Sequence, residues 1–72
     1  MTRKEAEDDM VQGFTDGYDL DAPEPSANRS CSYRHGFANG RDDRRHEPRA
    51  PAAWLREYAE ACIAADTYGG TP

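Results

Sequence analysis

A glycine-containing motif that occurs twice constrains the fold of this 72-residue chain more than any other feature. The segments GFTDGYD (13–19) and GFANGRD (36–42) carry glycines at the same spacing of four. Residues four apart lie above one another on a helix, so each glycine pair would form a flat strip. Small residues at this spacing let two helix backbones approach closely. The predicted packing seam consists of Gly13, Phe14, Gly17, Gly36, Phe37 and Gly40.

The glycines carry an energetic cost that their contacts must offset. Each interior glycine costs a helix about 1 kcal/mol relative to alanine. The structural interpretation is a helical hairpin in which Phe14 and Phe37 pack beside the seam. The alternative interpretation is that the glycines, which lack side chains, leave the helix backbone accessible to a partner such as RNA.

The hydrophobic periodicity predicts an all-α fold, with a small helical hairpin, a third helix and no sheet. A chain of this length forms a single small domain (1–72) with a marginal core, so help from a partner chain or a second copy is expected. The helices are expected over about residues 3–19, 31–45 and 51–67, with loops at 20–30 and 46–50. Prolines interrupt helical sequence in or beside both loops.

Capping residues support these helix boundaries. Thr2 and Glu5 fit a capping box at the first helix, and Ser30 or Ser32 is expected to cap the second. Pro51 suits the first position of the third helix, because the amide hydrogen it lacks has no partner there. Gly69-Gly70 is expected to end that helix.

The third helix is expected to cover the hairpin with its apolar side. Alanine, the best helix former, recurs through PAAWLREYAEACIAAD. Trp54 is interpreted as an anchor in the core, with an interface contact as the alternative. The side chains expected to pack across the first two helices are Leu55, Tyr58 and Cys62.

The charge is distributed unevenly along the chain, whose net charge is −5. Residues 1–28 carry two basic and eight acidic side chains, whereas residues 29–56 carry seven arginines and three acids. The simplest interpretation is an ordinary solvated surface. Two more specific interpretations are an arginine patch that binds phosphate or an acidic protein, and an acidic face that competes with nucleic acid for the basic groove of a target protein.

The glycine–aromatic motifs and the loop between them follow an order known from one protein family. Gly13-Phe14-Thr15-Asp16-Gly17 precedes a loop with Pro23 and Pro25, and Tyr33-Arg34-His35-Gly36-Phe37-Ala38-Asn39-Gly40 follows it. Over about residues 10–45, this order resembles the ribosome modulation factor family of small bacterial and phage proteins. The resemblance implies a small helical protein that binds the RNA of the ribosome and promotes ribosome dormancy.

The leading hypothesis is a non-enzymatic, regulatory protein that engages the ribosome, RNA or a ribonucleoprotein through its second helix. Arginines would contact phosphate, and one tyrosine would stack on bases. The candidate RNA- or partner-binding residues are Arg29, Tyr33, Arg34, Arg41, Arg44, Arg45 and Arg49.

Two other hypotheses remain open. An acidic inhibitor of the anti-CRISPR type would block the basic groove of a nucleic-acid-binding protein. Its acidic face would consist of Glu5, Glu7, Asp8, Asp9, Asp16, Asp19 and Asp21. Alternatively, the protein is an assembly subunit that forms a homodimer through Trp54 and the third helix.

Other chemistry has little support in the sequence. Cys31, His35, His46 and Cys62 could bind zinc, but the close ligand pairs typical of zinc sites are missing. A Cys31–Cys62 disulfide and a Cys–His nucleophile are also disfavoured, and no cofactor is expected. Neither a signal peptide nor a membrane-spanning segment is recognised. A cytoplasmic protein with reduced thiols is therefore expected.

Overall fold

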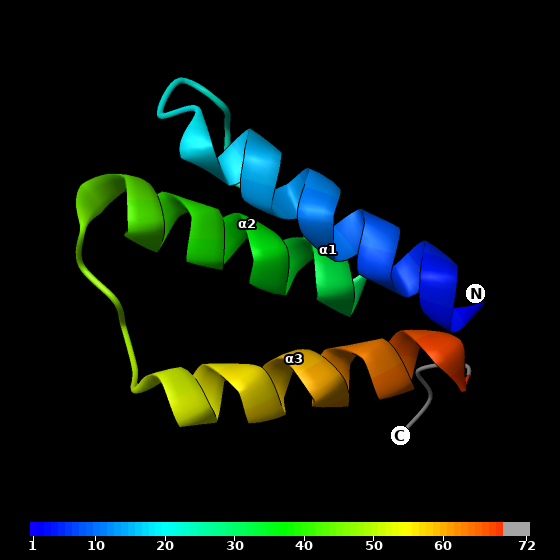
Figure 1. Ribbon diagram of the computed structural model, residues 1–72. Helices are drawn as coiled ribbons and strands as arrows, with labels where there is room; N and C mark the ends of the chain where they lie inside the picture. Colours follow the sequence, from blue (N-terminus) through cyan, green and yellow to red (C-terminus); the bar gives the residue numbers. More distant parts are fainter. Residues whose placement is uncertain (69–72) are drawn as a thin grey trace.

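The computed structural model describes residues 1–68, and within them the chain forms three α-helices and no strand (Figure 1). The helices are α1 (Arg3–Tyr18), α2 (Cys31–Arg45) and α3 (Ala52–Thr67). This confirms the predicted all-α, three-helix fold, and every helix end lies within one residue of its expected position.

The first two helices run parallel, so the prediction of a hairpin was wrong. In Figure 1, α1 and α2 lie side by side and point the same way. Residues 19–30 connect the end of α1 to the start of α2, and this loop begins at the far end of α1 in Figure 1. Twelve extended residues reach about 40 Å, whereas the 16 residues of α1 span only about 24 Å. The loop is therefore long enough to bring the chain back to the starting end.

The four glycines form the contact between α1 and α2, as predicted. A Cβ atom added at any of them would lie closer than 3.0 Å to a backbone carbonyl oxygen of the other helix. The carbonyl groups belong to Tyr33 for Gly13, Phe37 for Gly17, Met10 for Gly36 and Phe14 for Gly40.

These four contacts reveal a pseudo-twofold relation between α1 and α2. Each glycine contacts the residue that lies three positions before the equivalent glycine in the other copy of the motif. For example, Gly13 is equivalent to Gly36 and contacts Tyr33. The repeated motif therefore gives α1 and α2 equivalent contact surfaces in a parallel helix pair. The two phenylalanines differ in burial, because Phe37 is 2% exposed and Phe14 is 39% exposed.

The third helix runs antiparallel to the other two and packs on them less extensively. Only Cys62 and Ile63 of α3 are buried. The N-terminal end of α3 diverges from α2 in Figure 1. Trp54 is 47% exposed, so the prediction that it anchors α3 in the core was wrong. Of the side chains expected to pack across the first two helices, Cys62 is buried and Leu55 is half-buried. Tyr58 is 45% exposed, and its ring packs against that of His35 in α2 with centroids 4.9 Å apart.

Hydrogen bonds at the helix ends explain the accuracy of the boundaries. The capping box of Thr2 and Glu5 is present, and the Ser30 hydroxyl accepts the amide of Tyr33. Pro51 is the N-cap of α3 rather than its first helical residue. The predicted stop at Gly69-Gly70 lies outside the described residues. Within residues 1–68, no helix is both long and apolar enough to cross a membrane.

Candidate functional site

The seven predicted binding residues do not form one surface. Arg41 is the clearest departure, because its side chain is only 11% exposed. Its guanidinium donates hydrogen bonds to the carbonyl oxygens of Gly17 and Ala22, both at 2.9 Å, and to that of Asp19 at 3.3 Å. Arg41 therefore connects α2 to the C-terminal end of α1, where helical carbonyl groups lack intrahelical partners, and to the loop that follows.

Tyr33 is buried instead of being available for base stacking. Its hydroxyl donates to Asp16 Oδ2 at 2.5 Å, which lowers the pKa of Asp16 and raises that of Tyr33. The guanidinium of Arg29 lies 3.5 Å from the centre of the Tyr33 ring and covers one face. These residues join α1, α2 and the loop before α2.

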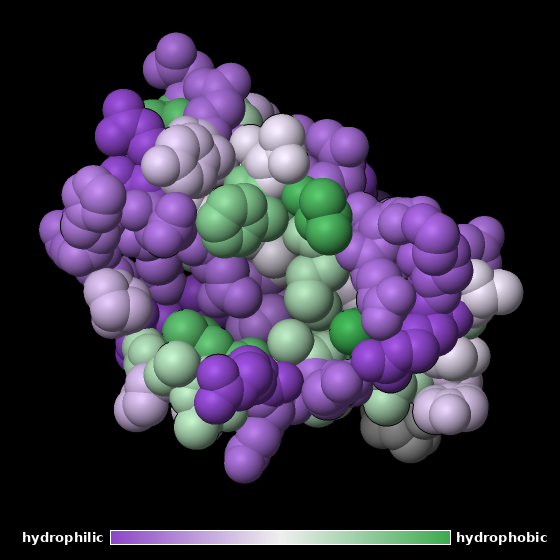
Figure 2. Space-filling model, in the orientation of Figure 1, coloured by the Kyte–Doolittle hydropathy of each residue, from purple (hydrophilic) through white to green (hydrophobic). Residues whose placement is uncertain are grey.

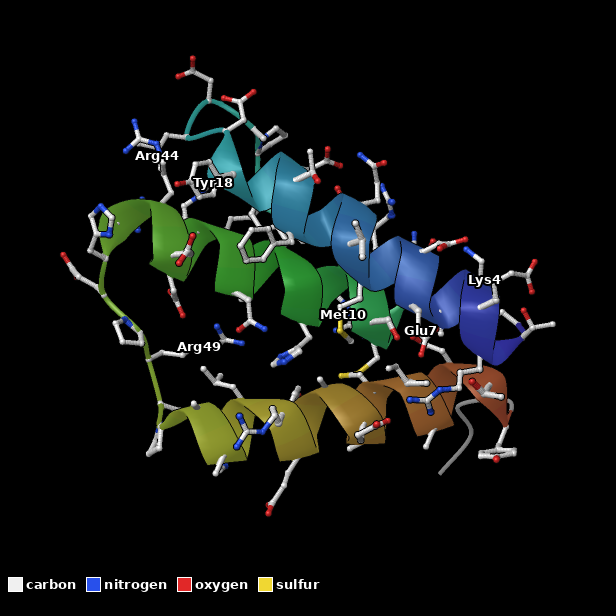
Figure 3. The ribbon with its side chains drawn as sticks, in the orientation of Figure 1. Lys4, Glu7, Met10, Tyr18, Arg44 and Arg49 are labelled. Atoms are coloured by element: carbon white, nitrogen blue, oxygen red, sulfur yellow. A yellow bond between two sulfur atoms is a disulfide. The ribbon has the colours of Figure 1, made fainter. Side chains whose placement is uncertain are left out.

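Arg44 and Arg45 occupy the last turn of α2, where positive charge complements the helix dipole. Figure 3 shows Arg44 near Tyr18 at the far end of the helix pair, and its guanidinium lies 6.0 Å from the tyrosine ring. Arg49 instead extends between α2 and the start of α3 (Figure 3). Only Arg34 and Arg49 of the seven residues lie close to α3.

A hollow of about 280 Å³ lies between α2 and α3, and we call it the arginine–aromatic hollow. The rings of Trp54 and Tyr58 stack there with centroids 5.0 Å apart and an interplanar angle of 20°. Its lining contains two arginines and no carboxylate. The lining residues are Cys31, Arg34, His35, Ala38, Arg49, Trp54 and Tyr58.

The floor of the hollow is a buried histidine with fixed partners. His35 is 3% exposed, and Arg49 Nη2 lies 3.1 Å from its Nδ1. A guanidinium can only donate, so Nδ1 accepts and Nε2 carries the proton. Nε2 then donates to the carbonyl oxygen of Leu55 at 3.2 Å, and Asn39 Nδ2, which lies 3.1 Å from the same nitrogen, does not donate to it. Arg49 also donates to Asn39 at 2.9 Å and to Asp42 at 2.6 Å, which fixes its guanidinium at the rim.

The protonation of His35 is expected to make stability depend on pH. Burial lowers the pKa of His35 and the charge of Arg49 lowers it further, although the hydrogen bond to Leu55 acts in the opposite direction. The folded-state pKa is therefore below the unfolded value of about 6.5. This stabilisation is fully present above that value and is lost as the pH falls through the folded-state pKa.

We expect the free energy of unfolding, measured by urea titration, to decrease as the pH falls from about 7 to about 5, because the unfolded chain binds a proton at His35 before the folded protein does. His35→Gln should flatten this dependence, whereas His46→Gln, at an exposed position, should preserve it. The same pH dependence in wild type and His35→Gln would contradict the assignment to His35.

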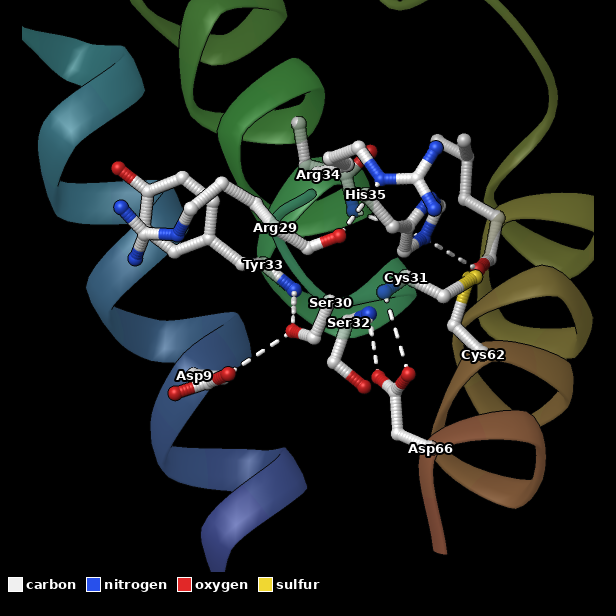
Figure 4. The surroundings of a disulfide bond; sticks show 12 residues. Asp9, Arg29, Ser30, Cys31, Ser32, Tyr33, Arg34, His35, Cys62 and Asp66 are labelled. Carbon is white, nitrogen blue, oxygen red and sulfur yellow. Dashed lines mark hydrogen bonds between the residues drawn. A yellow bond between two sulfur atoms is a disulfide. The ribbon is translucent and has the colours of Figure 1, made fainter. Parts of the chain in front are cut away.

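A disulfide joins Cys31 of α2 to Cys62 of α3 beside the hollow (Figure 4). Their Cα atoms are 5.0 Å apart. The expectation of reduced thiols was therefore wrong, because helix packing brings together two cysteines that are 31 positions apart in sequence. The bond also removes both sulfur ligands from the zinc site considered above.

Asp66 adds a second connection between these helices. Its carboxylate accepts the backbone amides of Cys31 at 3.2 Å and Ser32 at 2.7 Å (Figure 4). A carboxylate at a helix N-terminus satisfies unpaired amides and complements the helix dipole. Asp66 could not be recognised as a cap in the sequence, because capping from a distant helix leaves no local pattern.

The candidate acidic face consists mainly of carboxylates with partners in this chain. Glu5 accepts the Thr2 amide, while Glu7 and Asp8 pair with Arg3 and Lys4. Hydrogen bonds from Ser30, Tyr33 and the Asp21 amide reach Asp9, Asp16 and Asp19, respectively. Asp21 is exposed and has no side-chain hydrogen bond among the described residues. The acidic residues therefore support local structure more than one continuous face.

Other hollows differ from the arginine–aromatic hollow in charge. The hollow beside the 19–26 loop encloses about 540 Å³ and includes Asp16, Asp19 and Glu24 in its lining. Another, of about 310 Å³, has Asp42 and Asp43 beside Phe14 and Leu55. Figure 2 shows apolar side chains gathered between α1 and α3 and bordered by hydrophilic ones. The arginine–aromatic hollow is thus the better match for an anionic, planar ligand.

The two arginines of the hollow were predicted from the sequence as binding residues, whereas Trp54 was expected in the core and Tyr58 in the packing of the third helix. Trp54 and Tyr58 are four positions apart and therefore share a helix face, which was the available signal. No protein-family model, curated protein or solved structure matches this chain.

Proposed function

We propose that this chain is a non-enzymatic, cytoplasmic protein that binds single-stranded RNA, alone or within a ribonucleoprotein. The observation that carries the proposal is the exposed Trp54–Tyr58 stack beside Arg34 in a hollow without carboxylates. The resemblance to ribosome modulation factors points to the same class of ligand, with the ribosome as one such ribonucleoprotein.

The chemistry of the hollow suits unpaired nucleotides. Aromatic rings bind bases by stacking, which contributes about 1–3 kcal/mol per base. Guanidinium groups form charge-assisted, bidentate hydrogen bonds with phosphate. Arg34 makes no ion pair among the described residues, and its Nε donates only to the carbonyl oxygen of Arg29 at 3.1 Å. A base on the aromatic pair would therefore place its phosphate near an arginine without a competing carboxylate.

Variants of the hollow should separate this function from general charge attraction. With a fluorescently labelled single-stranded RNA at about 50 mM salt, Trp54→Ala and Arg34→Ala should each weaken binding about tenfold or more. Fluorescence anisotropy measures the affinity. Arg44→Ala is the matched control, because it removes the same charge from α2 outside the hollow and should change affinity about threefold at most.

Two results would contradict the proposal. One is no RNA association by the wild-type protein at low salt. The other is equal weakening by Arg34→Ala and Arg44→Ala, which would indicate attraction without a defined site. Affinity purification with and without nuclease distinguishes RNA from a protein target. Recovery of one protein that persists after nuclease treatment would favour the acidic-inhibitor hypothesis instead.

A further inference from the structure

The disulfide contributes to the wall of the proposed binding site. Cys31 is partly exposed and lines the arginine–aromatic hollow, whereas Cys62 is 1% exposed. A solvent thiol can therefore reach the bond at Cys31 Sγ from within the hollow. The same hollow contains Arg34, which makes no ion pair among the described residues and whose positive charge favours an approaching thiolate.

The disulfide also holds together the two halves of the hollow. Arg34 belongs to α2, and Trp54 and Tyr58 belong to α3. The other α2–α3 connections include the Asp66 hydrogen bonds, the His35–Leu55 hydrogen bond and the contact between the rings of His35 and Tyr58, whose centroids are 4.9 Å apart. Apart from the connecting loop, the disulfide is the covalent link between these helices.

We propose that reduction of the Cys31–Cys62 bond releases α3 and separates the aromatic pair from Arg34, so that RNA affinity depends on redox state. This inference rests on the proposed RNA-binding function. Disulfides in the cytoplasm are usually transient or redox-sensing, which fits a bond placed in a binding site. Bound RNA would in turn cover Cys31 and slow reduction.

The chemical step is thiol–disulfide exchange with a dithiol reductant. A reductant thiolate attacks Cys31 Sγ, the bond between the two cysteines breaks, and Cys62 leaves as a thiolate that takes a proton. The second reductant thiol then attacks the mixed disulfide and releases Cys31, which is also protonated. Two electrons and two protons pass to the protein, and the dithiol becomes a cyclic disulfide.

The test compares oxidised and dithiothreitol-reduced wild-type protein, with Cys31→Ser/Cys62→Ser as the matched control. Anisotropy with the same labelled RNA should show affinity about tenfold weaker after reduction. The double variant should bind like the reduced protein and be insensitive to dithiothreitol. Amide hydrogen exchange should show loss of protection in Ala52–Thr67 and retained protection in the α1–α2 seam, which shows that the rest of the protein stays folded.

The outcomes separate this inference from the proposed function. Unchanged RNA affinity and unchanged α3 protection after reduction would overturn the inference while leaving RNA binding intact. Failure of both redox states to bind RNA would overturn the proposed function, and with it redox control of RNA binding. Loss of α3 protection in that case would still show that reduction releases the helix. Thermodynamic linkage also requires saturating RNA to favour the oxidised protein. A disulfide–dithiol equilibrium with dithiothreitol that RNA leaves unchanged would therefore overturn the inference.

Discussion

Replacing Gly40 with alanine should lower the free energy of unfolding by about 2 kcal/mol or more. The added methyl group would overlap the carbonyl group of Phe14. The contact is with backbone, so no side-chain rotation relieves it and the helices must move apart. Their separation would also disturb the contact of Gly17 with Phe37, because both contacts belong to one seam.

Whether Gly40→Ala lowers or raises the free energy of unfolding shows whether Gly40 contacts the other helix. An alanine at an unobstructed helical position stabilises the helix by about 1 kcal/mol relative to glycine. Urea unfolding followed by circular dichroism would distinguish the two outcomes. Asp43→Ala, at an exposed position of α2, is the control and should change stability by about 0.5 kcal/mol at most. Increased stability of Gly40→Ala would contradict the seam.

Replacing Arg41 with alanine should lower the free energy of unfolding by about 2–3 kcal/mol. The substitution removes a charged donor from three carbonyl groups at the end of α1 and the following loop. The loop is needed to return the chain along the parallel pair. Loss of the donors therefore weakens the connection that makes this topology possible.

Urea unfolding again provides the measurement, with Arg45→Ala as a matched control. Arg45 is exposed on the same helix, so its removal should cost about 0.5 kcal/mol at most. Arg41→Lys should recover only part of the stability, because an ammonium lacks the planar fork of a guanidinium. Equal effects of Arg41→Ala and Arg45→Ala would show that Arg41 does not cap α1.

The helices and their glycine seam could be predicted because both depend on local sequence. The capping box at Thr2 and the proline-containing loops fix boundaries within a few residues. Glycine spacing shows which faces are able to touch. It does not determine whether the helices run parallel or antiparallel, because a flat strip accommodates either direction. The length of the loop at 19–30 was the available signal for the parallel arrangement.

The candidate site could be predicted only in part, because arginines serve several purposes. Arg41, Arg44 and Arg45 lie at helix C-termini, and Asp66 lies at the N-terminus of α2. Parallel neighbouring helices place like dipole ends together, so opposite charges at those ends are stabilising. Part of the uneven charge distribution along the sequence is therefore explained by charges that stabilise helix ends, and that part is no evidence of a ligand. Arg34 has no such partner, and only the position of α3 shows that Trp54 and Tyr58 lie beside it.

The fluorescence emission of Trp54, the single tryptophan of the chain, reports directly on whether RNA binds in the arginine–aromatic hollow. We expect single-stranded RNA to quench this fluorescence in the oxidised protein, because a base stacks on the indole. The quenching should be saturable and should weaken strongly as salt rises from about 50 to 200 mM. Unchanged Trp54 emission at RNA concentrations that saturate binding would contradict recognition through the arginine–aromatic hollow.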